Sequence, residues 1–237
     1  MKTTLHKANT RGIADHGWLK SQHSFSFANY FHPERMGFGA LRVINDDQIE
    51  GGTGFGTHPH ENMEIISVPL AGALHHKDTM GNDFVIREGE IQAMSAGTGI
   101  AHSEYNHSKV DLAKFLQIWV LPKKLNIEPQ YSQKVFDEKM RKNDWQLIVS
   151  PDGSEGSVSI NQDAYFSLVT LGADQGLDYE MKNPNNGVYF FQISGSSEVA
   201  GKVLTARDGL GVEQIEHPLY VKAKSSSEIL AMEVPMK

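Results

Sequence analysis

The sequence predicts an all-β protein with little helix, and two observations support this fold class. Short apolar segments separated by turn residues recur along most of the chain, about every 8–12 residues, as in β-sandwiches and β-barrels. The second half also repeats the order of strands and glycine turns that the first half shows. A chain of 237 residues could form one large β-domain, but this repeat favours two smaller ones.

The expected strands are identified by alternation of apolar and polar residues or by a high content of β-branched and aromatic residues. In the first half they cover residues 18–20, 24–27, 39–44, 64–70, 84–86, 91–95 and 115–121. Residues 31–38 and 45–48 carry turn-forming residues and are expected to be loops. In the second half, residues 188–194 and 228–234 repeat the patterns of 64–70 and 115–121. A weak helical period at residues 132–142 predicts a segment that links the two halves.

The composition excludes several classes of function. The net charge of −7 and the isoelectric point near 5.9 argue against direct binding to nucleic acid. The apolar segments are too short to cross a bilayer, and the N-terminus lacks the apolar core of a signal peptide. The absence of cysteine excludes disulfides, thiolate-bound metals and thiol nucleophiles, and it fits a reducing compartment. We therefore expect a cytoplasmic protein that is a monomer and does not contact membranes.

Four residues with metal-binding side chains occur as two pairs with the same spacing, each preceded by glycines. The pairs are His58 with His60, and His102 with Glu104. Residues two apart on a strand point to the same face, so two such strands side by side would direct three imidazoles and a carboxylate to one point. This ligand set suits iron(II), manganese, nickel, copper or zinc. On an octahedral ion it leaves positions open for a substrate, as in catalytic sites.

Other interpretations of these residues remain open from the pattern alone. His58-Pro59-His60 could be a polar loop and His102 a buried packing residue, although two matching pairs favour a metal site. Glu64, four residues after His60, could be a further ligand or could orient a ligand imidazole.

The remaining candidate residues are expected to have mainly structural roles. The histidines of the N-terminal segment are expected to be hydrogen-bonded packing residues; they are His16, His23 and His32. Four apolar residues are candidates for a pocket wall, with core packing as the favoured alternative; they are Phe25, Phe27, Phe55 and Met63. In the second half, alignment of Gly195 with Gly72 sets Met181 and Asn183 at the positions of the first histidine pair. We therefore expect no metal in the second half.

Two segments of the chain resemble the motifs of the cupin superfamily. Residues 52–64 read G-x5-H-x-H-x3-E, and residues 99–106 end in G-x2-H-x3-N. Two spacings depart from the general pattern, because Gly72 comes one residue late and Gly89 lies two residues too far from the second motif's histidine. More specifically, four segments resemble the pirin family: Asp15-His16-Gly17-Trp18, Ser24-Phe25-Ser26-Phe27, His58-Pro59-His60 and residues 94–104.

The resemblance covers essentially the whole chain and is closest to the bacterial pirin-like quercetin 2,3-dioxygenases. It implies a bicupin of two β-barrels (double-stranded β-helices), with a metal-binding barrel at residues 1–130 and a barrel without ligands at residues 131–237. The ligands it implies are His58, His60, His102 and Glu104. The expected cofactor is one divalent ion, iron(II), with manganese, nickel, copper, cobalt and zinc as alternatives. By this resemblance Glu64 is not a ligand.

The same resemblance implies a dioxygenase that opens the central ring of quercetin or a related flavonol or phenolic substrate, with loss of carbon monoxide. The metal would bind the 3-hydroxyl of the substrate and lower the pKa of that hydroxyl. Glu104 would be the base that takes the proton, with Glu64 as the other candidate. Some pirins are instead described as metal- or redox-sensing proteins that modulate a transcription factor. A non-enzymatic role with a protein partner is therefore the alternative.

Overall fold

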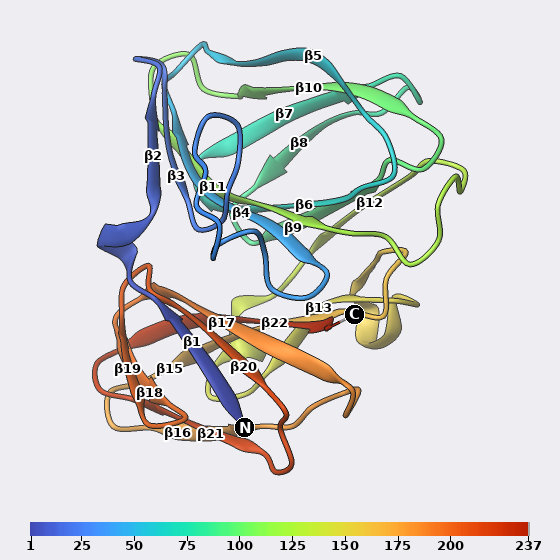
Figure 1. Cartoon of the computed structure of the whole chain (residues 1–237). Helices are drawn as coiled ribbons and strands as arrows, with labels where there is room; N and C mark the ends of the chain where they lie inside the picture. Colours follow the sequence, from blue (N-terminus) through green and yellow to red (C-terminus); the bar gives the residue numbers. More distant parts are fainter. Residues whose placement is uncertain (237) are drawn as a thin grey trace.

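The structure is a computed structural model that describes residues 1–236, and it consists of two β-barrels, one above the other in Figure 1. Each barrel combines one seven-stranded sheet with one four-stranded sheet. The expected all-β fold of two barrels is therefore confirmed. The only helices in the described part of the chain are three short 3₁₀ turns: η1 (Ala8–Thr10), η2 (Glu138–Arg141) and η3 (Ser154–Gly156). Among residues 1–236, no helix is long and apolar enough to cross a membrane.

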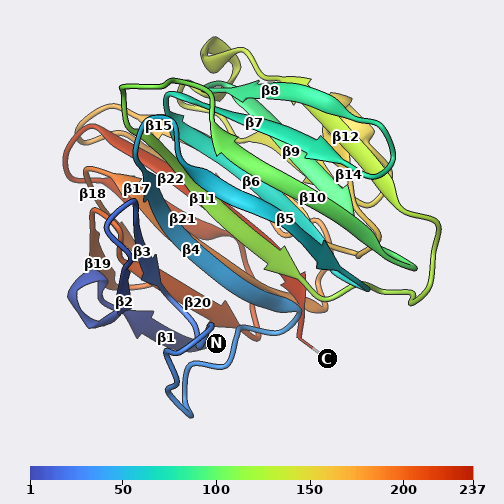
Figure 2. The same cartoon turned by 90° about the horizontal axis from the view of Figure 1, so that it is seen from above.

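The N-terminal barrel consists of the eleven strands from β2 to β12. Its large sheet has the order β12-β9-β6-β11-β4-β3-β2, and its small sheet has the order β5-β10-β7-β8. Figure 2 shows the four strands of the small sheet side by side, seen from above. The strands are β2 (Gly12–Asp15), β3 (Leu19–His23), β4 (Leu41–Ile49), β5 (Gly54–His60), β6 (Glu64–Ala71), β7 (Ala73–Asp78), β8 (Asp83–Arg87), β9 (Glu90–Ser95), β10 (Ile100–Asn106), β11 (Ala113–Val120) and β12 (Gln130–Val135).

The C-terminal barrel repeats this arrangement, as the sequence pattern predicted. Its large sheet has the order β1-β20-β17-β22-β15-β13-β14, and its small sheet has the order β16-β21-β18-β19. The pair β17 and β22 thus corresponds to β6 and β11. The strands are β1 (Lys2–His6), β13 (Gln146–Ser150), β14 (Val158–Ser159), β15 (Tyr165–Leu171), β16 (Gly176–Tyr179), β17 (Asn186–Ser194), β18 (Ser196–Val199), β19 (Lys202–Thr205), β20 (Gly209–Glu213), β21 (Leu219–Ala223) and β22 (Ser227–Pro235).

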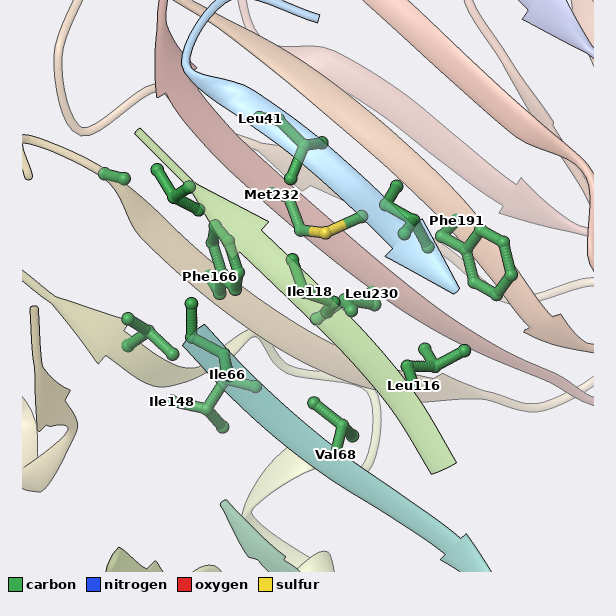
Figure 3. Close-up of a cluster of buried hydrophobic side chains, with 14 of the residues drawn as sticks. Leu41, Ile66, Val68, Leu116, Ile118, Ile148, Phe166, Phe191, Leu230 and Met232 are labelled. Atoms are coloured by element: carbon green, nitrogen blue, oxygen red, sulfur yellow. The ribbon is translucent and has the colours of Figure 1, made fainter. Parts of the chain in front are cut away.

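An apolar layer between the two large sheets joins the barrels (Figure 3). Alternation along β6 explains how one strand serves both this layer and the barrel interior. Ile66 and Val68 point into the layer, whereas Ile65 and Ser67 point into the N-terminal barrel. The buried side chains labelled in Figure 3 come from both barrels: Leu41, Ile66, Val68, Leu116, Ile118, Ile148, Phe166, Phe191, Leu230 and Met232.

Two strands cross the division expected after residue 130. β1 at the N-terminus pairs with β20 and so extends the large sheet of the C-terminal barrel, as Figure 1 shows. β12 starts at residue 130 but pairs with β9 in the N-terminal barrel. β12 therefore belongs to the N-terminal barrel, and β1 connects the start of the chain to the C-terminal barrel.

Three local expectations were wrong, each for a physical reason. Residues 45–48 are turn-forming by type, but they lie within β4 because backbone pairing with β3 and β11 on both sides holds them extended. Residues 24–27 form only an isolated bridge, Phe27 with Tyr30, instead of a strand. Residues 132–142 are not one helix, because β12 continues to Val135 and only residues 138–141 turn into η2.

The shared layer predicts that the barrels unfold together. Phe166 of β15 is fully buried in this layer, so Phe166→Ala should lower the free energy of unfolding by about 3–5 kcal/mol in one cooperative transition. Urea unfolding followed by far-ultraviolet circular dichroism and by tryptophan fluorescence measures this change. Val135→Ala is the control, because Val135 is 75% exposed, and it should change the free energy by less than about 0.5 kcal/mol. Two separate transitions, with only the second shifted by Phe166→Ala, would contradict a shared core.

Candidate metal centre

The histidine pairs converge because β5 and β10 are hydrogen-bonded neighbours in the small sheet of the N-terminal barrel. In their antiparallel register, His102 lies directly opposite His58. His60 points to the same side as His58, since the two are two residues apart on β5. The ring centroids are 4.8 Å apart for His58 and His60, 4.5 Å for His58 and His102, and 4.9 Å for His60 and His102. One nitrogen from each ring lies within 4.8 Å of the others, which is the arrangement of a three-histidine metal site.

The Nε2 atoms of these histidines have the chemistry that a divalent metal requires. His58 directs Nδ1 at the carbonyl of Gly56, 2.8 Å away, so an Nδ1–H donates there and, in the neutral ring, Nε2 is the nitrogen that carries the lone pair. The Nε2 atoms of His60 and His102 are buried and have no hydrogen-bond partner in the protein. Burial lowers the pKa of His60 to about 4 and the pKa of His102 still further, so both rings are neutral near pH 7. The three side chains therefore fit a divalent ion.

Glu104 lies two residues beyond His102, after a β-bulge, and is buried in the barrel. Its carboxylate accepts a hydrogen bond of 3.2 Å from Ser67 Oγ and one of 3.1 Å from Gln117 Nε2. Burial raises the pKa of this carboxyl to about 7, and the two hydrogen bonds partly offset the rise. Its oxygens group with nitrogens of His102 and His76, and Glu104 lines the same cavity as the β5 histidines. Its role as the fourth ligand stays a prediction.

A chain of hydrogen bonds leads from His102 away from the cavity. His102 Nδ1 lies 3.4 Å from His76 Nδ1, and His76 Nε2 lies 3.0 Å from Asp78 Oδ2. If His102 Nε2 binds a metal, His102 Nδ1–H donates to His76 Nδ1, so that His76 Nε2–H donates to Asp78. Asp78 also accepts from the backbone N–H groups of Met80 and Asn82, which fix its position. The set therefore determines the tautomer and orientation of His102.

The sequence contained a signal for this chain that the motif analysis did not use. His76 and Asp78 have the same spacing of two residues as the other donor pairs, and they lie on β7, the other neighbour of β10. In the register, Glu104 is opposite His76 and His102 is opposite Asp78. Three donor pairs on three adjacent strands thus meet at one place in the small sheet.

Glu64 has a structural role elsewhere. It is fully buried at the start of β6, accepts a short hydrogen bond from Ser95 Oγ and accepts a 3.0 Å bond from the backbone N–H of Asn161. Asn161 belongs to the second half of the chain, so Glu64 links the two barrels. Its hydrogen bonds thus agree with a position outside the ligand set.

A cavity of about 290 Å³ opens beside the histidines. Trp119 forms one wall and lies edge-on to His60, with ring centroids 5.0 Å apart, and Phe27 packs edge-on against Trp119 at 5.4 Å. Of the four apolar candidates, Phe27 and Phe55 line this cavity, whereas Phe25 is in the layer between the barrels and Met63 packs against a core cluster. The residues that line the cavity are Ala14, His16, Leu19, Ser21, His23, Phe27, Ala28, Asn45, Asp47, Phe55, His58, His60, Glu104, Gln117 and Trp119.

Several lining residues were not identified as functional from the sequence. His16 and His23 were expected to be packing residues, and residues 45–48 were expected to be a turn. Pairing of β3 with β4 brings Ser21, His23, Asn45 and Asp47 to the cavity wall. Residues 45–48 are all polar, so no alternation of apolar and polar residues marked this part of β4 as a strand or showed which face lies inside.

The C-terminal barrel has apolar residues where the first has donors. Val199 is the fourth residue after Gly195, as His76 is the fourth after Gly72, and Val199 pairs with Val221. By the register of the small sheet, Leu219 and Tyr179 then take the places of His102 and His58. This register differs by two residues from the sequence alignment, which set Met181 there. Tyr179, Leu219 and Val221 belong to one buried apolar cluster, so these positions hold neither an imidazole nor a carboxylate.

Two family models match the chain. The model described as Pirin matches residues 5–120, and the model described as quercetinase C-terminal cupin domain matches residues 147–234. The matched ranges cover most of the two barrels in turn. The second match agrees with the expectation of a cupin barrel in the C-terminal half.

Curated relatives align over nearly the full length. The chain is 44% identical over 231 residues to a protein named quercetin 2,3-dioxygenase from Escherichia coli strain K12, with 98% of each chain covered. It is 42% identical over 224 residues to a putative quercetin 2,3-dioxygenase from Pseudomonas aeruginosa, covering 94% of this chain and 95% of the relative.

Solved structures show the same architecture. A bacterial pirin from Escherichia coli, YhhW, in complex with nickel(II), is 42% identical, covers 99% of each chain and superimposes with a TM-score of 0.93. A quercetin 2,3-dioxygenase from Acinetobacter baumannii shares the fold with a TM-score of 0.77 at 17% identity, covering 98% of this chain and 79% of that one. The identity to the curated relatives over nearly the whole chain establishes that this protein belongs to the pirin family.

Proposed function

We propose that this protein is a metal-dependent dioxygenase that opens the central ring of quercetin or a related flavonol. The observation that carries the proposal is the convergence of three imidazoles on one point at the edge of an aromatic-walled cavity. Neutral imidazoles with open space beside them are typical of catalytic metal sites. The names of the relatives from Escherichia coli and Pseudomonas aeruginosa support this substrate class.

The metal site is proposed to consist of His58, His60, His102 and Glu104, holding one divalent ion. The donor set suits iron(II) and also manganese, nickel, copper, cobalt and zinc. The nickel(II) complex of the Escherichia coli pirin supports a bound divalent ion. When bound, the ion supplies Lewis acidity that lowers the pKa of a coordinated hydroxyl group.

The protein groups around the site would bind the substrate and move its proton. Trp119 and Phe27 offer aromatic surfaces against which a flat flavonol ring can pack. A Glu104 carboxylate oxygen is proposed to accept the proton of the 3-hydroxyl group. Ser67 and Gln117 hold this carboxylate by hydrogen bonds, so its position is set before the substrate arrives.

The proposal is tested by quercetin turnover in air. Protein loaded with iron(II) should bleach the absorbance of quercetin, and parallel samples with the other divalent metals identify the active ion. His102→Ala removes an Nε2 donor, so it should reduce both the metal content and the rate to background. His107→Ala is the control, since His107 is an exposed histidine immediately after the same strand.

Absence of bleaching with every divalent metal would contradict the enzymatic proposal. A protein that still bound one metal ion per chain in that case would instead fit the alternative function, a metal-sensing protein with a protein partner. Metal content and turnover are therefore measured on the same samples.

The proposed role of Glu104 predicts a specific change in rate. Glu104→Gln keeps the shape and the possible oxygen ligand but removes the base, so turnover should fall by about 10²-fold or more while the metal remains bound. Stopped-flow kinetics at saturating quercetin, with metal analysis of the same preparation, measures this change. Undiminished turnover by a variant that retains its metal would exclude Glu104 as the base.

The chain from His102 to Asp78 predicts an effect on metal affinity. His76→Phe keeps an aromatic ring at this position but removes the acceptor of the His102 Nδ1–H group, so the affinity for the divalent ion should fall about 10–100-fold. Competition with a chromogenic chelator measures this affinity without a turnover assay. His75→Phe is the matched control, because His75 is the preceding residue on β7 and pairs with the exposed Asp83. Equal weakening by both substitutions would contradict a positioning role for His76.

A further inference from the structure

We propose that Ser21, His23, Asn45 and Asp47 form a subsite that binds the hydroxyl groups of a polyhydroxylated aromatic substrate. These four residues are called the polar quartet below. The inference rests on the proposed function, and it concerns how the substrate is selected and oriented rather than how the metal acts on it.

The polar quartet is one continuous patch on the wall of the cavity. Ser21 and His23 lie two residues apart on β3, and Asn45 and Asp47 lie two residues apart on β4. In the antiparallel register, Ser21 is opposite Asp47 and His23 is opposite Asn45. All four side chains therefore share one face of the sheet, and all four line the cavity that also contains His58 and His60.

Each member of the polar quartet is buried and has a polar atom without a partner in the protein. The exposed fractions are 3% for Ser21, 3% for His23, 4% for Asn45 and 4% for Asp47. The unpartnered atoms are Ser21 Oγ, His23 Nδ1, Asn45 Oδ1 and Asp47 Oδ1. Buried polar groups in proteins are nearly always hydrogen-bonded, so these atoms are available to a molecule that enters the cavity.

Buried polar atoms without a hydrogen-bond partner are concentrated around this cavity. Within residues 1–236, twelve buried side-chain polar atoms lack a partner, and six of them belong to residues that line this cavity. The other two, besides the polar quartet, are His60 Nε2 and Trp119 Nε1. One faces the proposed metal, and the indole N–H of Trp119 is a further donor for a bound substrate.

Two polar residues of the same strands that face the other way, Gln22 and Asp46, have partners within the protein. Asp46 of β4 accepts from Arg11 at 3.1 Å and forms an ion pair with Arg207 at 3.3 Å. Gln22 of β3 accepts a hydrogen bond from Arg11. Asp46 and Gln22 thus have partners within the chain. The polar quartet lacks them, which points to a ligand.

The chemistry of the polar quartet suits phenolic hydroxyl groups, which both donate and accept hydrogen bonds. Asn45 Oδ1 is an acceptor, and Ser21 Oγ can act in either direction. Burial raises the pKa of Asp47 to about 7; the hydroxyl of the facing Ser21 partly offsets this rise, and the nearby carboxyls of Asp46 and Glu104 add to it. Asp47 can therefore donate when protonated and accept when ionised. Burial also lowers the pKa of His23, so its neutral ring offers a donor and an acceptor.

An aromatic wall connects the polar quartet to the metal site. His23 and Phe27 have ring centroids 5.2 Å apart, Phe27 and Trp119 are 5.4 Å apart, and Trp119 and His60 are 5.0 Å apart. All three contacts are edge-to-face, so the rings form a surface rather than a filled stack. A flat molecule bound at the metal by one hydroxyl group could lie along this surface and direct its other hydroxyl groups at the polar quartet.

Anaerobic binding to the metal-loaded protein tests this inference. Quercetin is compared with 3-hydroxyflavone, which keeps the 3-hydroxyl group and the ring system but lacks the four other hydroxyl groups. Wild-type protein should bind quercetin at least about tenfold more tightly, since unpaired buried groups cost affinity when the matching hydroxyl is missing. Tryptophan fluorescence quenching gives both dissociation constants without turnover.

Two variants test the polar quartet without changing a proposed metal ligand. Ser21→Ala removes one hydroxyl, and Asn45→Leu replaces an amide with an apolar side chain of similar size. Each should weaken quercetin binding about tenfold and leave 3-hydroxyflavone binding within twofold, with unchanged metal content. Lys20→Ala is the control, because Lys20 is exposed on β3 and points away from the polar quartet; it should alter neither constant.

The outcomes distinguish the two proposals. The inference is overturned if wild-type protein binds both flavonols equally well, or if the variants weaken the binding of both flavonols alike. In either case the polar quartet does not bind the additional hydroxyl groups, and the proposed function still stands. If the metal-loaded wild type binds neither flavonol, the proposed function fails and the subsite fails with it. Loss of the quercetin preference alone, with metal retained, supports the inference.

Discussion

The antiparallel pairing of β5 with β10 is the constraint on which the candidate site depends. It sets His58 opposite His102, and the period of two along β5 adds His60 on the same side. A shift of one residue in this register would turn His102 to the other face of the sheet. The bulge after His102 and the pairing of β10 with β7 fix the remaining polar residues around this contact. The geometry of the site is thus set by backbone hydrogen bonds, not by the side chains alone.

The C-terminal barrel contributes to this register without donating a ligand. The large sheets of both barrels share one apolar layer, so the strands behind the site are held on their outer faces by the second barrel. Glu64 and β1 add links at the edges, since Glu64 accepts from Asn161 and β1 pairs with β20. A rigid sheet behind a site limits the movement of groups mounted on it. The second barrel is therefore a support for the first.

Much of the fold and part of the site could be predicted from the sequence. The strands that carry regular apolar patterns, such as residues 64–70 and 115–121, lie where the pattern placed them, and the histidine pairs converge. Residues 45–48 were predicted wrongly because asparagine and aspartate favour turns locally, whereas pairing with β3 and β11 decided their conformation. His76 and Asp78 were overlooked because their role depends on a neighbour 26 residues away, His102. Local pattern indicates the strands, and only the register shows which side chains meet.

The contrast between the barrels indicates what the cavity costs and why it is retained. At the positions of His58 and His102, the second barrel holds Tyr179 and Leu219 in a packed apolar cluster. The same topology can thus hold packed apolar side chains at these positions, and close packing favours the folded state. The first barrel instead keeps an open space with buried polar atoms that lack partners. Such a space is stabilised when a ligand binds to the folded state. A fold with one packed barrel and one open barrel therefore separates the task of stability from the task of binding.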